Sequence, residues 1–150
     1  MKILLAVDGS SCSEAAARSV AQRPWPPGSR VLILSAYEGV MIMPIPEAGA
    51  LPPDFWKQIT AQARERAAAA VSQAEKIVRD ASPTLSIDTR VVEGYPKQAI
   101  LNEAEQWSAD LIVLGSHGHR GLTRLWLGSV SQSVAVHANC SVEIVRERTP

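Results

Sequence analysis

The stretch Leu111-Ile112-Val113-Leu114-Gly115-Ser116-His117-Gly118, continued by Gly128-Ser129-Val130-Ser131, decides the fold of this 150-residue chain. Four branched apolar residues predict a buried strand. The glycines predict a loop whose backbone can approach a ligand closely. A helix is then expected from Ser129 to about His137, and its unpaired first-turn N–H groups would attract an anion. Strand, glycine loop and helix start together predict a phosphate site, with a nucleotide as the leading ligand.

Strand and helix signals alternate along the whole chain. Apolar runs predict five strands, at 3–7, 31–34, 87–92, 111–114 and 142–145. Helical spacing and start signals, including a capping box at Ser11-x-x-Glu14, predict helices at 11–22, about 54–81, 96–107 and 129–137. Such alternation is typical of an α/β fold with right-handed crossovers. The expected architecture is a doubly wound, five-stranded parallel sheet with helices on both faces.

The strand order can also be predicted from polarity. The run at 87–92 alternates apolar and polar residues, as an edge strand does, whereas the first and fourth runs are apolar throughout. This favours the order 3-2-1-4-5, with the switch point between strands one and four. Ligands bind beyond the carboxyl ends of strands at such a point. Asp8 and Gly115 should therefore flank one crevice.

Composition excludes several classes of protein. Fifteen basic and fifteen acidic residues cancel, so the chain has no electrostatic footprint for nucleic acid. No segment approaches the ~20 apolar residues of a membrane span. Cys12 and Cys140 form no metal-binding or redox pair, which favours a reducing, cytoplasmic setting. The length suits a single domain over residues 1–150.

Several residues allow a second interpretation. Asp8 could be only a turn former or helix cap, and Ser131 could only satisfy a helix's first turn. His117 and His119 lack a third metal ligand, so we expect exposed loop histidines and no metal site. The long connection at 37–53 could be a lid, a partner surface or a variable loop. Neither a P-loop nor a nucleophile-elbow motif is present.

The glycine loop matches a known family signature. Gly115-x2-Gly118, nine residues, then Gly128-Ser129 reproduces G-x2-G-x9-G-S/T. The chain thereby resembles the universal stress proteins, and the resemblance extends to Val7-Asp8-Gly9-Ser10, to Val92-Glu93-Gly94-Tyr95-Pro96 and to Ala109–Ser116. Four segments that agree in order and spacing carry more weight than one glycine pattern. The resemblance implies a Rossmann-like fold and membership of the subgroup that binds ATP.

The resemblance also implies roles for individual residues. The three motif glycines would pass close to phosphate and ribose, and Ser129 would donate to a phosphate oxygen with help from the neighbouring amides. Asp8 would lie near ribose or adenine, and Ala36 near the adenine edge. The expected nucleotide-binding set is Asp8, Ala36, Leu114, Gly115, Gly118, Arg120, Gly128, Ser129, Val130 and Ser131.

Three functions follow from these expectations. The leading one is an ATP-binding regulatory module of the stress response, a cytoplasmic homodimer joined through the last strand, with Mg²⁺ as an optional companion of ATP. Ser141 stands where the family commonly has proline, which would loosen that dimer edge. The alternatives are a slow ATP hydrolase or nucleotidyl transferase built around Asp8, and a nucleotide-free scaffold. The sequence does not identify the stress trigger or the protein partners.

Overall fold

The computed structural model describes residues 1–39, 53–118 and 127–147, and these residues form alternating strands and helices. The strands are β1 (Lys2–Ala6), β2 (Arg30–Tyr37), β3 (Ser86–Glu93), β4 (Leu111–Gly115) and β5 (Ser141–Val145). The helices are α1 (Ser11–Gln22), α2 (Pro53–Ala81), α3 (Pro96–Trp107) and α4 (Ser129–His137).

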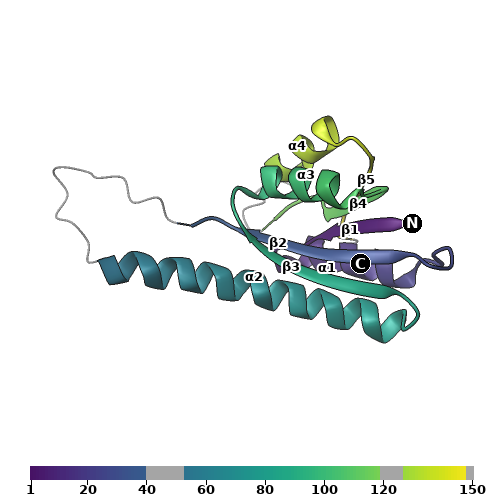
Figure 1. The fold of residues 1–150 in the computed structure, drawn as a ribbon, viewed down its shortest axis with the longest axis horizontal. Helices are drawn as coiled ribbons and strands as arrows, with labels where there is room; N and C mark the ends of the chain where they lie inside the picture. Colours follow the sequence, from purple (N-terminus) through teal and green to yellow (C-terminus); the bar gives the residue numbers. More distant parts are fainter. Residues whose placement is uncertain (40–52, 119–126, 148–150) are drawn as a thin grey trace.

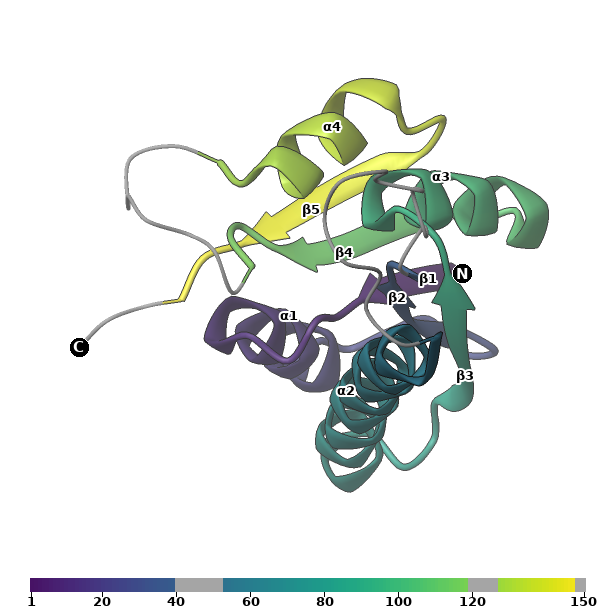
Figure 2. The ribbon, with the colours of Figure 1, turned by 90° about the vertical axis from the view of Figure 1, so that its left-hand side faces the viewer.

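All the strands belong to one parallel sheet with the order β3-β2-β1-β4-β5. The predicted fold class and strand order are therefore confirmed. β1 lies between β2 and β4, with Leu5 paired to Ile33 on one side and to Val113 on the other. Figure 2 shows α1 and α2 on one face of the sheet and α3 and α4 on the other.

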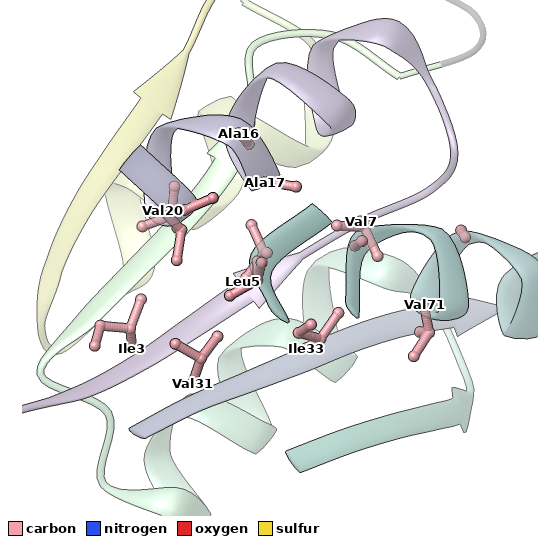
Figure 3. Packing of buried hydrophobic residues seen from close by; sticks show 14 of the residues in the cluster. Ile3, Leu5, Val7, Ala16, Ala17, Val20, Val31, Ile33 and Val71 are labelled. Carbon is pink, nitrogen blue, oxygen red and sulfur yellow. The ribbon is translucent and has the colours of Figure 1, made fainter. Parts of the chain in front are cut away.

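Each face of the sheet has its own apolar core. The cluster under α1 and α2 includes Ile3, Leu5, Val31, Ile33 and Val113, all at most 1% exposed (Figure 3). Alternate residues of the same strands point the other way and form the cluster under α3 and α4, which includes Leu4, Leu32 and Ile112. Because both faces are covered, the central strands can be apolar throughout, which is why they were predicted to be central.

Two element boundaries differ from the sequence expectations. The cap of α1 is Ser10, whose Oγ accepts from the Ser13 amide, so the predicted capping box at Ser11 is one residue late. β2 continues beyond the apolar run to Tyr37, because it pairs with β3 along its whole length. The Tyr37 carbonyl also accepts from the Gly94 amide. The connection predicted at 37–53 therefore starts later, and its residues 40–52 lie outside the described part of the chain.

The long helix α2 extends past the end of the sheet (Figure 1). Its buried residues begin at Ala67 and recur at helical spacing to Val78. From Asp54 to Arg66 the helix residues are exposed or half-buried, and Phe55 is 42% exposed. The sheet therefore supports the second half of α2 and leaves the first half beyond the carboxyl ends of the strands. Among the described helices, none combines the length and the apolar character that crossing a bilayer requires.

Candidate functional site

Asp8 follows the carboxyl end of β1 and lies at the edge of the sheet where β1 and β4 adjoin. Its Oδ1 accepts from the Ser10 amide at 3.0 Å and from Ser10 Oγ at 2.6 Å. The carboxylate is exposed, yet these bonds fix its orientation. The result is an oriented acidic group at the switch point of the sheet, where a crevice is expected between the carboxyl ends of β1 and β4.

Gly118 follows β4 on the other side of this switch point and meets Asp8. A Cβ added at Gly118 would lie 2.5 Å from Asp8 Oδ2. Asp8 and the glycine loop, 110 positions apart in the sequence, are thus brought together as the strand order predicts. Gly115 is also tightly packed, because an added Cβ would lie 2.7 Å from the backbone carbon of Cys12 in α1. Both positions leave no room for a side chain without movement of their neighbours.

Gly128 is the N-cap residue of α4 and is hydrogen-bonded to Ser116, the residue after β4. Its amide donates to the Ser116 carbonyl at 2.8 Å, and an added Cβ would lie 3.2 Å from the same oxygen. Ser131 Oγ donates to the carbonyls of Ser116 and Gly128, at 3.0 and 2.9 Å. The helix then starts with its Ser129 and Val130 amides in the first turn, where N–H groups have no intrahelical acceptor. An anion at this end would meet backbone donors and the positive end of the helix dipole.

Two of the remaining predicted site residues lie near the carboxyl ends of β4 and β2, and the third lies outside the described residues. Leu114 is the buried residue before Gly115, and its neighbour in β1 is Ala6. Ala36 is half-buried near the carboxyl end of β2. Arg120 lies outside the described residues, as does His119.

His117 differs from the exposed loop histidine that we expected. It is half-buried, its Nδ1 lies 3.1 Å from Ser116 Oγ, and its Nε2 is buried without a hydrogen-bond partner among the described residues. Its carbonyl accepts from Ser10 Oγ at 3.3 Å. The Ser116 hydroxyl, in turn, donates to Cys12 Sγ in α1 at 3.8 Å. The imidazole is therefore partly buried and lies against the Ser116 hydroxyl.

Sequence reasoning missed the serines that hold the crevice together. Ser10 and Ser116 are 8% and 2% exposed, and both bond the crevice backbone. A single signal was available for Ser10, namely its position two residues after Asp8, where a hydroxyl can close an Asx-type turn. No comparable signal exists for Ser116, because its role depends on the return of the chain at Gly128.

No group of three metal-ligating side chains occurs among residues 1–39, 53–118 and 127–147. A separate cavity of about 620 Å³ lies between α3 and α4 and contains none of the predicted nucleotide-binding residues. Cys140 lines this cavity. Burial, with a smaller contribution from the Asp110 charge, raises the pKa of the Cys140 thiol, and a backbone hydrogen bond at Ile112 opposes the rise. The volume of this cavity favours it as a ligand site, but the first-turn amides of α4 and the oriented Asp8 carboxylate favour the switch point between β1 and β4 as the nucleotide site.

Comparison with known proteins agrees with the fold. The model of the family described as "Universal stress protein family" matches residues 1–146. A universal stress protein of Thermus aquaticus is 35% identical over 147 residues, which cover 96% of this chain and 97% of the relative. The chain belongs to the universal stress protein family.

Two solved structures place the chain within that family's structural range. UspA from Lactobacillus plantarum is 28% identical and superimposes with a TM-score of 0.77, covering 97% of each chain. A universal stress protein crystallised in complex with cAMP is 25% identical, with a TM-score of 0.70 and coverage of 97% of this chain and 96% of the other. The second structure is of a relative that holds an adenine nucleotide.

Proposed function

We propose that this protein is a regulatory module that binds an adenine nucleotide, ATP in the leading case, in the crevice between β1 and β4. One observation carries the proposal. Asp8 and Gly118 meet at the switch point of the sheet, beside the first turn of α4. The site therefore combines a carboxylate suited to ribose hydroxyls with backbone donors suited to phosphate.

Each predicted residue has a physical role in this proposal. Gly115, Gly118 and Gly128 would keep the backbone close to the nucleotide, and the amides of residues 129–131 would bind phosphate oxygens. The Ser129 hydroxyl, exposed at the first helical position, would donate to the same phosphate. Ala36 and Leu114 would border the base and ribose. We also propose that the Arg120 side chain contacts the phosphate.

The relatives support an adenine nucleotide as the ligand class. One family member that is 25% identical over nearly the whole chain was crystallised with cAMP. The spacing G-x2-G-x9-G-S, present here in full, supports the proposal that the nucleotide is ATP. Mg²⁺ would accompany ATP through the phosphates, because Mg²⁺ is usually held by one or two carboxylates and phosphate oxygens. We assign a binding role rather than turnover.

We also propose a cytoplasmic homodimer of single-domain subunits, joined through β5. The Val145 carbonyl accepts from the Ser116 amide, so the backbone groups of Val145 face β4. By alternation, the N–H and C=O groups of Val142 and Ile144 face away from the sheet and can pair with a second strand. Sedimentation of the wild type should give a dimer. Ile144→Pro, which removes an outward donor, should give a monomer.

Calorimetric titration tests the nucleotide proposal directly. The wild type should bind ATP, ADP, AMP or cAMP, and Gly118→Val and Gly128→Val should abolish binding because the added side chains fill the crevice. Full-affinity binding by both variants, or no binding of any of these nucleotides by the wild type, would refute it. Phosphate release with ATP and Mg²⁺ measures the alternative. Sustained turnover that Asp8→Ala removes, with folding retained, would establish a hydrolase.

A further inference from the structure

Two consecutive carbonyls at the end of β4 are held by serines from two different helices. The His117 carbonyl accepts from Ser10 Oγ, at the cap of α1. The Ser116 carbonyl accepts from Ser131 Oγ, in the first turn of α4, and from the Gly128 amide. The two peptide units that join Ser116 to Gly118 are thereby fixed between the N-termini of α1 and α4. Gly118, at the end of this segment, meets Asp8.

Neither hydroxyl is oriented to serve a ligand. Ser131 is 2% exposed, and its hydroxyl lies within 3.0 Å of two carbonyls of the chain. Ser10 is 8% exposed, and its Oγ lies 2.6 Å from Asp8 Oδ1 as well as 3.3 Å from the His117 carbonyl. Ser10 therefore connects the carboxylate on one side of the crevice to the glycine loop on the other.

We propose that Ser10 and Ser131 are positioning residues of the nucleotide site, which set the separation between Asp8 and the first-turn amides of α4. The inference rests on the proposed function. It adds Ser10, which lies outside the expected nucleotide-binding set, and it gives the Ser131 hydroxyl, as distinct from the Ser131 amide, a role that needs no contact with the nucleotide. Ser131 holds the phosphate side, because it joins the glycine loop to the start of α4. Ser10 holds the ribose side, because it orients Asp8.

The close packing around Gly128 leaves little room for another donor to replace these hydrogen bonds. A Cβ at Gly128 would already lie 3.2 Å from the Ser116 carbonyl and 3.4 Å from His117 Cα. Loss of one hydroxyl leaves a buried carbonyl with fewer donors, and the loop can recover donors only by moving toward solvent. A movement of this kind displaces the phosphate-binding amides from the ribose-binding carboxylate, which weakens a ligand that must reach both.

The two serines should affect different parts of the nucleotide. Ser131→Ala should weaken AMP binding about five- to twentyfold, the loss expected for one buried hydrogen bond, while adenosine binding stays within about twofold. Ser10→Ala should weaken AMP and adenosine together, because both contain the ribose. Ser10→Thr keeps the hydroxyl and should restore affinity. A role in stability alone would not separate AMP from adenosine.

A matched control uses another buried serine. Ser29 is 4% exposed and donates to the Pro26 carbonyl at 2.7 Å, at the opposite end of the sheet. Ser29→Ala should lower the melting temperature to a similar degree and leave both affinities unchanged. If Ser131→Ala does not fold, Ser131→Cys keeps nearly the same volume with a weaker donor and serves in its place.

Calorimetry on the full chain decides between the outcomes. The proposal is overturned if the Ser131 variant binds AMP within about twofold of the wild type, if AMP and adenosine fall equally in that variant, or if Ser29→Ala weakens AMP as strongly. Failure of the wild type to bind either compound overturns the proposed function as well. Wild-type binding with unaffected serine variants overturns the positioning role alone.

Discussion

Substitution of Gly118 by alanine tests whether the close approach of the glycine loop to Asp8 matters for binding. The added Cβ would lie 2.5 Å from Asp8 Oδ2, about 0.9 Å short of ordinary van der Waals contact. Asp8 is exposed and its carboxylate can shift, but a shift away from the new methyl group would disturb the bonds that Asp8 Oδ1 accepts from Ser10 at 2.6 and 3.0 Å. Since Gly118 does not have a positive φ, the contact with Asp8 is the expected cause of any effect.

The magnitude follows from the bonds that are lost. A hydrogen bond to a charged group contributes about 1.5–3 kcal/mol, so disorienting Asp8 should weaken nucleotide binding by roughly 10- to 150-fold. Asp8 and Gly118 are both exposed, so the free energy of unfolding should change by less than about 1 kcal/mol. A large loss of affinity with little change in stability is therefore the expected signature of Gly118→Ala.

A double-mutant cycle shows whether the effect passes through Asp8. Calorimetric titration with AMP is carried out on the wild type, Gly118→Ala, Asp8→Ala and the double variant. Asp8→Ala removes the atoms that the new methyl group would contact, so adding Gly118→Ala to it should cost almost nothing further. Wild-type affinity in Gly118→Ala would refute the reasoning, and so would a full additional loss in the double variant.

Three further outcomes are expected. Gly115→Ala should lower stability by about 1–3 kcal/mol, seen as a lower melting temperature, because the new Cβ meets backbone that cannot rotate away. The raised pKa of Cys140 should slow its alkylation at neutral pH, and Asp110→Asn should speed it. The raised pKa also makes the free energy of unfolding depend on pH. Below the ordinary thiol pKa, Cys140 is protonated in the folded and the unfolded chain, and this group leaves stability independent of pH. As pH rises through the ordinary and then the raised pKa, the unfolded chain loses the thiol proton first, so stability falls. Arg23→Ala, which breaks a half-exposed ion pair with Glu143, should cost no more than about 1 kcal/mol in thermal unfolding.

The order of the strands could be predicted because it depends on patterns within short segments. The continuous apolar run at 111–114 requires cover on both faces, and the alternating run at 87–92 requires an open edge. Because β1 and β4 are parallel neighbours, the segments that follow these two strands must lie close together at the same end of the sheet. The approach of Asp8 to Gly118 follows from topology without any knowledge of side-chain packing.

The boundaries and the buried serines could not be predicted in the same way. β2 runs to Tyr37 because of its pairing with β3, whereas the continuous run of branched apolar residues stops at Leu34. Ser131 bonds a carbonyl that lies 15 positions earlier in the chain. Such contacts depend on where a loop returns, which local propensity does not determine. The partial burial of His117 was missed for the same reason, since a histidine in a glycine loop is ordinarily solvated.

The excess length of α2 divides that helix into two parts with different local stability. A helix of 29 residues is about 43 Å long, whereas eight strand residues extend about 27 Å. Only the part from Ala67 onward gains burial from the sheet. Backbone amides of α2 before Ala67 should exchange with deuterium rapidly, through local fraying of the helix. Those after Ala67 should exchange slowly, because their exchange requires unfolding of a larger part of the domain. The first turns of α2 can therefore unwind and re-form while the crevice at β1 and β4 keeps its geometry.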